Sequence, residues 1–169
     1  EIFQDQDFFL AIKNTLGISL MKLFIGFPLP IIFALFLNEI RSAGFKKSVQ
    51  TISYLPHFLS WVVLGGIMTS WFSEGGFVNE LLMSMGMTES PIAFLGQTKG
   101  FWTLAVLSDV WKELGWGAII YLAAISGIPP ELYEAATIDG AGRFQKILYV
   151  TIPSIAGTIT ILLILAVSG

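Results

Sequence analysis

The 169-residue sequence contains no cysteine and one histidine, and it lacks the GxxxxGK[ST] motif of phosphate-binding loops. Without cysteine, disulfides, thiolate metal sites and cysteine nucleophiles are excluded. His57 has no carboxylate near it in the sequence, so we expect it to pack against neighbours rather than bind a metal. Neither a metal nor another cofactor is expected. Any nucleotide chemistry would require a separate chain.

Charge is also scarce, since charged residues make up 12% of the chain and hydrophobic residues 54%. A soluble domain carries roughly a quarter charged residues. The net charge of −3 and the absence of a basic run leave no surface for nucleic acid. We therefore expect an integral membrane protein in contact with the lipid bilayer.

Long hydrophobic runs support this expectation. A helix needs about 20 apolar residues to cross the bilayer core. Four runs predict an all-α, polytopic transmembrane bundle with spans at about 14–38, 55–73, 101–126 and 152–169. Pro28 and Pro30 would kink the first span. The last run stops at Gly169 and the start does not resemble a signal peptide, so we expect a partial domain from a larger protein.

The distribution of basic residues predicts the orientation. The link after the first span carries Arg41, Lys46 and Lys47, whereas the link 74–100 carries three glutamates and one lysine. Because positive residues favour the cytoplasmic side, we expect the link 74–100 to be extracytoplasmic and the segment 127–151 to be cytoplasmic. Asp5 and Asp7, before the first span, would lie outside. An amphipathic helix within 74–100 would lie on the membrane surface or cover the bundle.

The polar segment "ELYEAATIDGAGRFQKILYVTIP", from Glu131 to Pro153, separates the last two hydrophobic runs. Pro129-Pro130 is typical of a helix start, and Asp139-Gly140 is typical of a turn. Two short helices with small residues at their centre can enter a groove on another protein. A re-entrant or surface helix that merely links two spans explains the pattern equally well at this point.

The same segment resembles the EAA loop of permease subunits of ATP-binding-cassette (ABC) importers. That motif reads Glu-Ala-Ala, three residues, Gly, nine residues, Ile-x-Leu-Pro. Here Glu134-Ala135-Ala136 is followed by Gly140 and then by Val150 to Pro153, with conservative changes at Val150 and Ile152. Further stretches, such as "KKSVQTISYLPHFLSWVVLGGIM", are similar to the maltose-permease-like carbohydrate branch, particularly permeases for oligo- or polysaccharides. The resemblance implies a type I importer core, of which this chain would supply helices two to five.

The resemblance further implies a bacterial plasma (inner) membrane location and a set of partners. These are a separate cytoplasmic ABC ATPase dimer, a second and different permease subunit, an extracytoplasmic solute-binding protein and a sugar substrate. Glu134 would be the main polar contact with the ATPase, and Gly140 would fix the angle between two coupling helices. For Asp139 and Arg143, an ordinary cap or surface charge is an equal alternative. The implied ATPase-coupling residues are Glu134, Ala135, Ala136, Asp139, Gly140, Arg143 and Pro153.

A second candidate site lies in the run 101–126. Charged side chains inside a membrane usually face a bundle interior or an aqueous cavity, and Asp109 could pair with Lys112 three residues later. Sugar sites combine such polar groups with flat aromatic faces. The alternative is a structural ion pair beside tryptophans that anchor the helix at the interface. The predicted substrate-pathway residues are Asp109, Trp111, Glu113 and Trp116.

Two classes of function remain. In the first, the chain is the membrane-spanning permease subunit of a carbohydrate importer and is not itself an enzyme. In the second, it is an integral membrane enzyme acting on a lipid-linked sugar. Asp109 and Glu113 are four residues apart and can share a helix face, as an acid/base pair would require. The enzyme hypothesis leaves the segment Glu131 to Pro153 unexplained.

Overall fold

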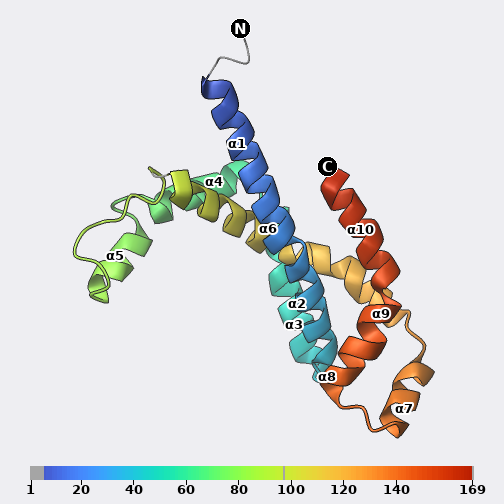
Figure 1. Cartoon of the computed structure of the whole chain (residues 1–169). Helices are drawn as coiled ribbons and strands as arrows, with labels where there is room; N and C mark the ends of the chain where they lie inside the picture. The colour runs from blue at the N-terminus through green and yellow to red at the C-terminus, as the bar shows by residue number, and fades with distance from the viewer. Residues whose placement is uncertain (1–5, 97, 169) are drawn as a thin grey trace.

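The structure is a computed structural model that describes residues 6–96 and 98–168. Within these ranges the regular elements are all helical, as the sequence predicts. The central element is α6 (Thr98–Ser126), a helix of 29 residues. It crosses behind the N-terminal helices and links the α4–α5 side of the molecule to the α7–α10 side (Figure 1). Asp5 and Gly169, both named in the sequence predictions, lie outside the described residues.

The N-terminal elements form one long helical rod. It comprises α1 (Gln6–Met21), the π-helical turn η2 (Lys22–Gly26) and α2 (Pro28–Glu39). Proline at position 28 has no N–H to give, and the helix widens just before it, where the Phe27 N–H donates to the Lys22 carbonyl at 3.2 Å. The expected kink is therefore absorbed as a π turn. Phe8–Glu39 is long and apolar enough to cross a membrane as one helix.

The second predicted span, 55–73, is not a single helix in the structure, and whether it crosses a membrane stays a prediction. Instead α3 (Ala43–Tyr54) continues into the 3-10 turn η3 (Leu55–Phe58), and α4 (Trp61–Phe72) begins after a break. The two halves, Ala43–Phe58 and Trp61–Ser84, are bent by 98°. Ser60 explains the restart, because its side chain accepts the Val63 N–H at 3.2 Å and caps α4.

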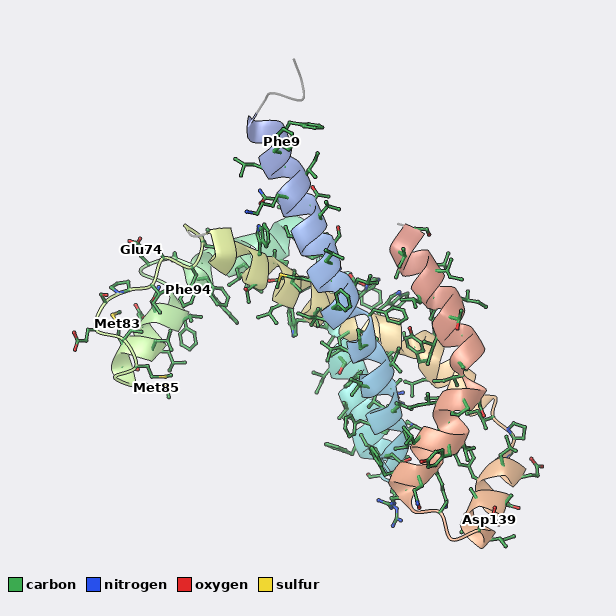
Figure 2. The ribbon with its side chains drawn as sticks, in the orientation of Figure 1. Phe9, Glu74, Met83, Met85, Phe94 and Asp139 are labelled. Carbon is green, nitrogen blue, oxygen red and sulfur yellow. The ribbon has the colours of Figure 1, made fainter. Side chains whose placement is uncertain are left out.

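The link 74–100 contains the expected short helix, α5 (Phe77–Ser84). Asn79 is fully buried there. Its amide donates to the carbonyls of Ser73 and Ile92, both at 3.0 Å, and accepts the Ile92 N–H at 2.8 Å. These bonds fold the link back on itself beside α4, at the left of Figure 2.

The C-terminal part begins with α7 (Pro130–Ile138) and α8 (Arg143–Lys146). The π turn η4 (Ile147–Thr151), α9 (Ile152–Ser154) and α10 (Ala156–Ser168) follow. The helical segments Arg143–Ser154 and Ala156–Ser168 meet at a bend of 63°. The bend lies two residues after Pro153, which breaks the helix.

By length and composition, the residues described contain one helix that could span a membrane, or up to three if each bent pair is one span. The helix α6 is not among them, because Asp109, Lys112 and Glu113 lie in its middle. The third expected span, 101–126, therefore stays a prediction.

Small residues bring α6 close to its neighbours, as they do in membrane helix packing. Ala118 of α6 and Ala34 of α2 are both fully buried in the core cluster, which also includes Tyr121, Ile125 and Ile155. On another face, a Cβ at Gly115 would fall on the backbone carbonyl of Ser53 in α3. The α3–α6 crossing thus depends on a missing side chain.

We expect Gly115→Ala to destabilise the protein by about 1–3 kcal/mol, because the added methyl group forces α3 and α6 apart. Gly65→Ala on α4 is a matched control, since nothing lies within 4 Å of its Cβ position. Alanine favours a helix by about 1 kcal/mol over glycine, so the control should be neutral or slightly stabilising. Thermal unfolding in detergent, followed by tryptophan fluorescence, measures both. Equal melting temperatures for the two variants would contradict this packing.

Candidate functional site

The hairpin consists of α7, the turn at residues 139–142 and α8. Backbone hydrogen bonds at the turn fix its conformation. Gly140 has a φ of +79°, a conformation that L side chains rarely adopt. Its N–H donates to the Thr137 carbonyl at 3.0 Å, and the Ala141 N–H donates to the Ala136 carbonyl at 2.8 Å. This pair of bonds is the Schellman motif, which ends a helix at a glycine. Gly140 therefore fixes the direction in which the chain leaves α7.

Side chains inside the hairpin tie its two arms together. The hydroxyl groups of Tyr133 and Thr151 lie 2.9 Å apart, and Thr151 is 2% exposed. Lys146 Nζ donates to the Thr137 hydroxyl at 2.8 Å. That hydroxyl donates in turn to the Tyr133 carbonyl at 2.6 Å. Sequence reasoning missed these residues, because the bonds join positions nine and eighteen residues apart and no local pattern reveals them.

The predicted coupling residues lie mostly on the outside of the hairpin. Glu134, Ala135, Asp139 and Arg143 are exposed, and Ala136 is half-buried. Glu134, Asp139 and Arg143 form no ion pair within the part of the chain that the structure describes. Asp139 lies at the tip, at the lower right of Figure 2.

Two large apolar side chains accompany these residues. Ile138 is 87% exposed and Phe144 is 75% exposed. The tip of the hairpin thus presents both apolar and unpaired charged groups. Pro153, the last predicted coupling residue, is exposed just before the bend into α10.

A groove of about 770 Å³ lies between the α1–η2–α2 rod, α6 and α10. Asp109 and Glu113 both line it. Asp109 Oδ1 is 3.0 Å from Lys22 Nζ, so the expected Asp109–Lys112 pair is wrong. The two partners on different helices meet because η2 packs against α6.

The two predicted pathway tryptophans lie elsewhere. Trp111 lines a second, apolar groove of about 560 Å³ with Met68, Phe72 and Phe94. Trp116 stacks on the His57 ring, with centroids 4.3 Å apart and planes 2° from parallel. The structure therefore brings Asp109 and Glu113 together in one groove but does not bring Trp111 and Trp116 to it.

Lys112, Glu113 and His57 form a second polar cluster at the break between α3 and α4. Lys112 Nζ donates to the His57 carbonyl at 2.7 Å and to Glu113 Oε1 at 3.2 Å. His57 Nδ1 lies 2.8 Å from Glu113 Oε2. The packing role expected for His57 is confirmed by its stack on Trp116, but its carboxylate partner was not foreseen.

Known proteins are similar to the chain over nearly its whole length. Protein LplB of Bacillus subtilis (strain 168) is 42% identical over 170 residues, 100% of this chain and 53% of that protein. The polygalacturonan/rhamnogalacturonan transport system permease protein YteP of the same organism is 46% identical, over 98% of this chain and 51% of that protein. The chain thus spans about half the length of these relatives.

The chain is also similar to a solved structure over nearly its whole length. It is the crystal structure of a bacterial ABC transporter involved in the import of the acidic polysaccharide alginate, and it matches with a TM-score of 0.94 and 45% identity. The match covers 98% of this chain and 57% of the other. A complex of that type of transporter with alginate pentasaccharide-bound periplasmic protein matches with a TM-score of 0.93. The predicted fold class, an all-α fragment of an ABC transporter permease core, is confirmed.

The family profile described as "Binding-protein-dependent transport system inner membrane component" matches residues 26–169. This range includes α2, α6, the hairpin and every residue that lines the apolar groove beside Trp111. The chain belongs to the binding-protein-dependent transport system inner membrane components.

Proposed function

We propose that this chain is part of the membrane-spanning permease subunit of a bacterial ABC importer for an oligo- or polysaccharide. The hairpin 127–151 carries this proposal, because it is a rigid, outward-facing element within the family match. It lies on the cytoplasmic side and enters a cleft of a separate ATPase. ATP hydrolysis belongs to that separate subunit, as the match to an inner membrane component of a transport system supports.

The hydrogen bonds within the hairpin allow it to transmit movement of the ATPase to the membrane helices. When the ATPase dimer closes around ATP, it pulls the hairpin. The bonds from Tyr133 to Thr151 and from Lys146 to Thr137 keep the arms from sliding past each other. The pull then passes into α6 and α10, which enclose the groove. In this mechanism Glu134 is the main polar contact, Ala135 and Ala136 allow close approach, and Ile138 and Phe144 supply apolar contact.

The partners proposed are an ABC ATPase dimer, a second permease subunit of different sequence and an extracytoplasmic solute-binding protein. The alginate transporter matched above supports the binding protein as a partner, since it was solved with an alginate pentasaccharide-bound periplasmic protein. The names of the relatives also support a carbohydrate substrate, because YteP is a polygalacturonan/rhamnogalacturonan permease.

The sugar path proposed for this chain is the groove that Asp109 and Glu113 line. Carboxylates accept hydrogen bonds from sugar hydroxyls, and Tyr121 adds an aromatic ring to the lining. The alternative of a membrane enzyme loses support on two grounds. Asp109 is paired with Lys22 and Glu113 with Lys112, and the match to the family explains the hairpin, which an enzyme would not require.

Gly140→Val tests the coupling role. A side chain at φ +79° costs about 1–2 kcal/mol in the left-handed region, and the chain can no longer leave α7 in the native direction. We expect the full-length complex to assemble normally, with ATP hydrolysis stimulated by the loaded binding protein reduced about tenfold. Gly157→Val is the matched control, because nothing lies within 4 Å of its Cβ position. Full stimulation of the Gly140→Val complex would count against coupling through the hairpin.

Asp109→Asn tests the sugar path. We expect about tenfold slower uptake of a labelled oligogalacturonide or alginate oligosaccharide into proteoliposomes, with ATPase binding unchanged. Adding Lys22→Met separates two explanations. If Asp109 contacts sugar, the double variant stays slow; if it only pairs with Lys22, the double variant recovers because no unpaired charge remains. Trp111→Ala, which alters the other groove, should leave uptake intact.

A further inference from the structure

The break between α3 and α4 lies against the middle of α6. Backbone outside a helix is tolerated at membrane depth only where the protein itself satisfies its polar groups. At this break the carbonyls that end η3 have no following helical turn to bond. Lys112 supplies a donor to one of them, the His57 carbonyl, at 2.7 Å. A cation at the C-terminal end of a helix is also favoured by the helix dipole.

Three residues of α6 hold this break, at positions i, i+1 and i+4 of the helix. Lys112 is 5% exposed and also lies over the Trp61 ring at the start of α4, 5.4 Å from its centroid. Glu113 binds the His57 side chain at 2.8 Å. Trp116 stacks on His57 and meets Phe58 edge-on at 5.9 Å. Together they contact the end of α3–η3 and the first residue of α4.

We call Lys112, Glu113 and Trp116 the clamp. These three residues belong to α6, the helix that leads directly into the hairpin. Between α6 and α7 only Gly127 to Pro129 intervene, and the backbone bonds from Gly127 to Ala124 and from Ile128 to Ile125 continue the helical path. Ile125 and Ile128 are buried in the core. A displacement of the hairpin is therefore passed to α6 rather than absorbed in a loose linker.

We propose that Lys112, Glu113 and Trp116 are positioning residues that make α4 move as one body with α6. This proposal rests on the proposed function, in which an ATPase moves the hairpin. The clamp passes that movement around a 98° bend to α4 and to the folded link that follows it. The proposal also gives Trp116 a role at the break between α3 and α4 rather than in the sugar path.

The test measures the distance between α4 and α6 in two states of the assembled, full-length transporter. Spin labels replace Gly66 of α4, which has nothing within 4 Å of its Cβ position, and the exposed Ala123 of α6. The 169 residues contain no cysteine, so the two labels are unique within them. Distances are recorded without nucleotide and after trapping with ATP and vanadate.

With the clamp intact, we expect one narrow distance that is the same in both states. In Lys112→Met the cation is lost and α4 no longer follows α6, so the distance should become dependent on nucleotide. Basal ATP hydrolysis should be unchanged, and stimulation by the loaded binding protein should fall about tenfold. Trp116→Leu, which removes the stacking surface without changing charge, should shift both readouts in the same direction. Lys13→Met, on the exposed face of α1, is the control and should behave as wild type.

Two results would overturn the clamp. One is a Lys112→Met or Trp116→Leu complex with wild-type distances and stimulation. The other is a changed distance that is identical in both states, which indicates a merely structural contact. Failure of the proposed function gives a different result, because the unmodified permease would then neither bind the ATPase nor support stimulated hydrolysis.

Discussion

The charged side chains in the middle of α6 hold this helix against its neighbours, because each of them has a partner within the protein. Asp109 pairs with Lys22 at the π turn of the N-terminal rod. Lys112 and Glu113 bind the break between α3 and α4. Lys112 is 5% exposed, and a buried cation is costly unless it is paired and hydrogen-bonded. The position of α6 against its neighbours on two sides depends on these contacts.

The packing of α6 against α2 and α3 depends on the same contacts. Close contact at Gly115 and Ala118 lets α6 pack against α3 and α2, which in turn brings the ionic partners within reach. The C-terminal end of α6 then leads without a flexible linker into the hairpin, whose arms are cross-bonded. In the proposed mechanism, a pull on the hairpin reaches the groove beside Asp109 through α6 and reaches the bend at α4 through Lys112, Glu113 and Trp116.

Local sequence patterns predicted the features that depend only on residues close together in the chain. The helical class, the short helix α5 and the turn at Gly140 follow from hydrophobic runs, breakers and a glycine in the left-handed region. The family motif from Glu134 to Pro153 also depends on local spacing. Residue pairs within one helix turn were easy to propose, and this is why Asp109 was assigned to Lys112.

The remaining features depend on how helices rotate against each other, which the sequence of one helix does not specify. Lys22 meets Asp109, and His57 meets Glu113, across large sequence separations. The run 55–73 carries no Asp, Glu, Lys or Arg, so its mean hydropathy hides the break that Pro56 and the Ser60 cap introduce. Trp111 and Trp116 lie on one helix but on different faces, and therefore in different surroundings.

The central claim is that the tip of the hairpin contacts an ATPase in the cytoplasm. A photo-reactive amino acid in place of Ile138, which is 87% exposed, tests this in the assembled transporter in native membranes. Val62 of α4, at 86% exposed, is the control position. The account predicts an adduct between position 138 and the ATPase subunit, and none from position 62. No ATPase adduct from position 138, or reaction of that position with an impermeant reagent added outside the cell, would contradict it.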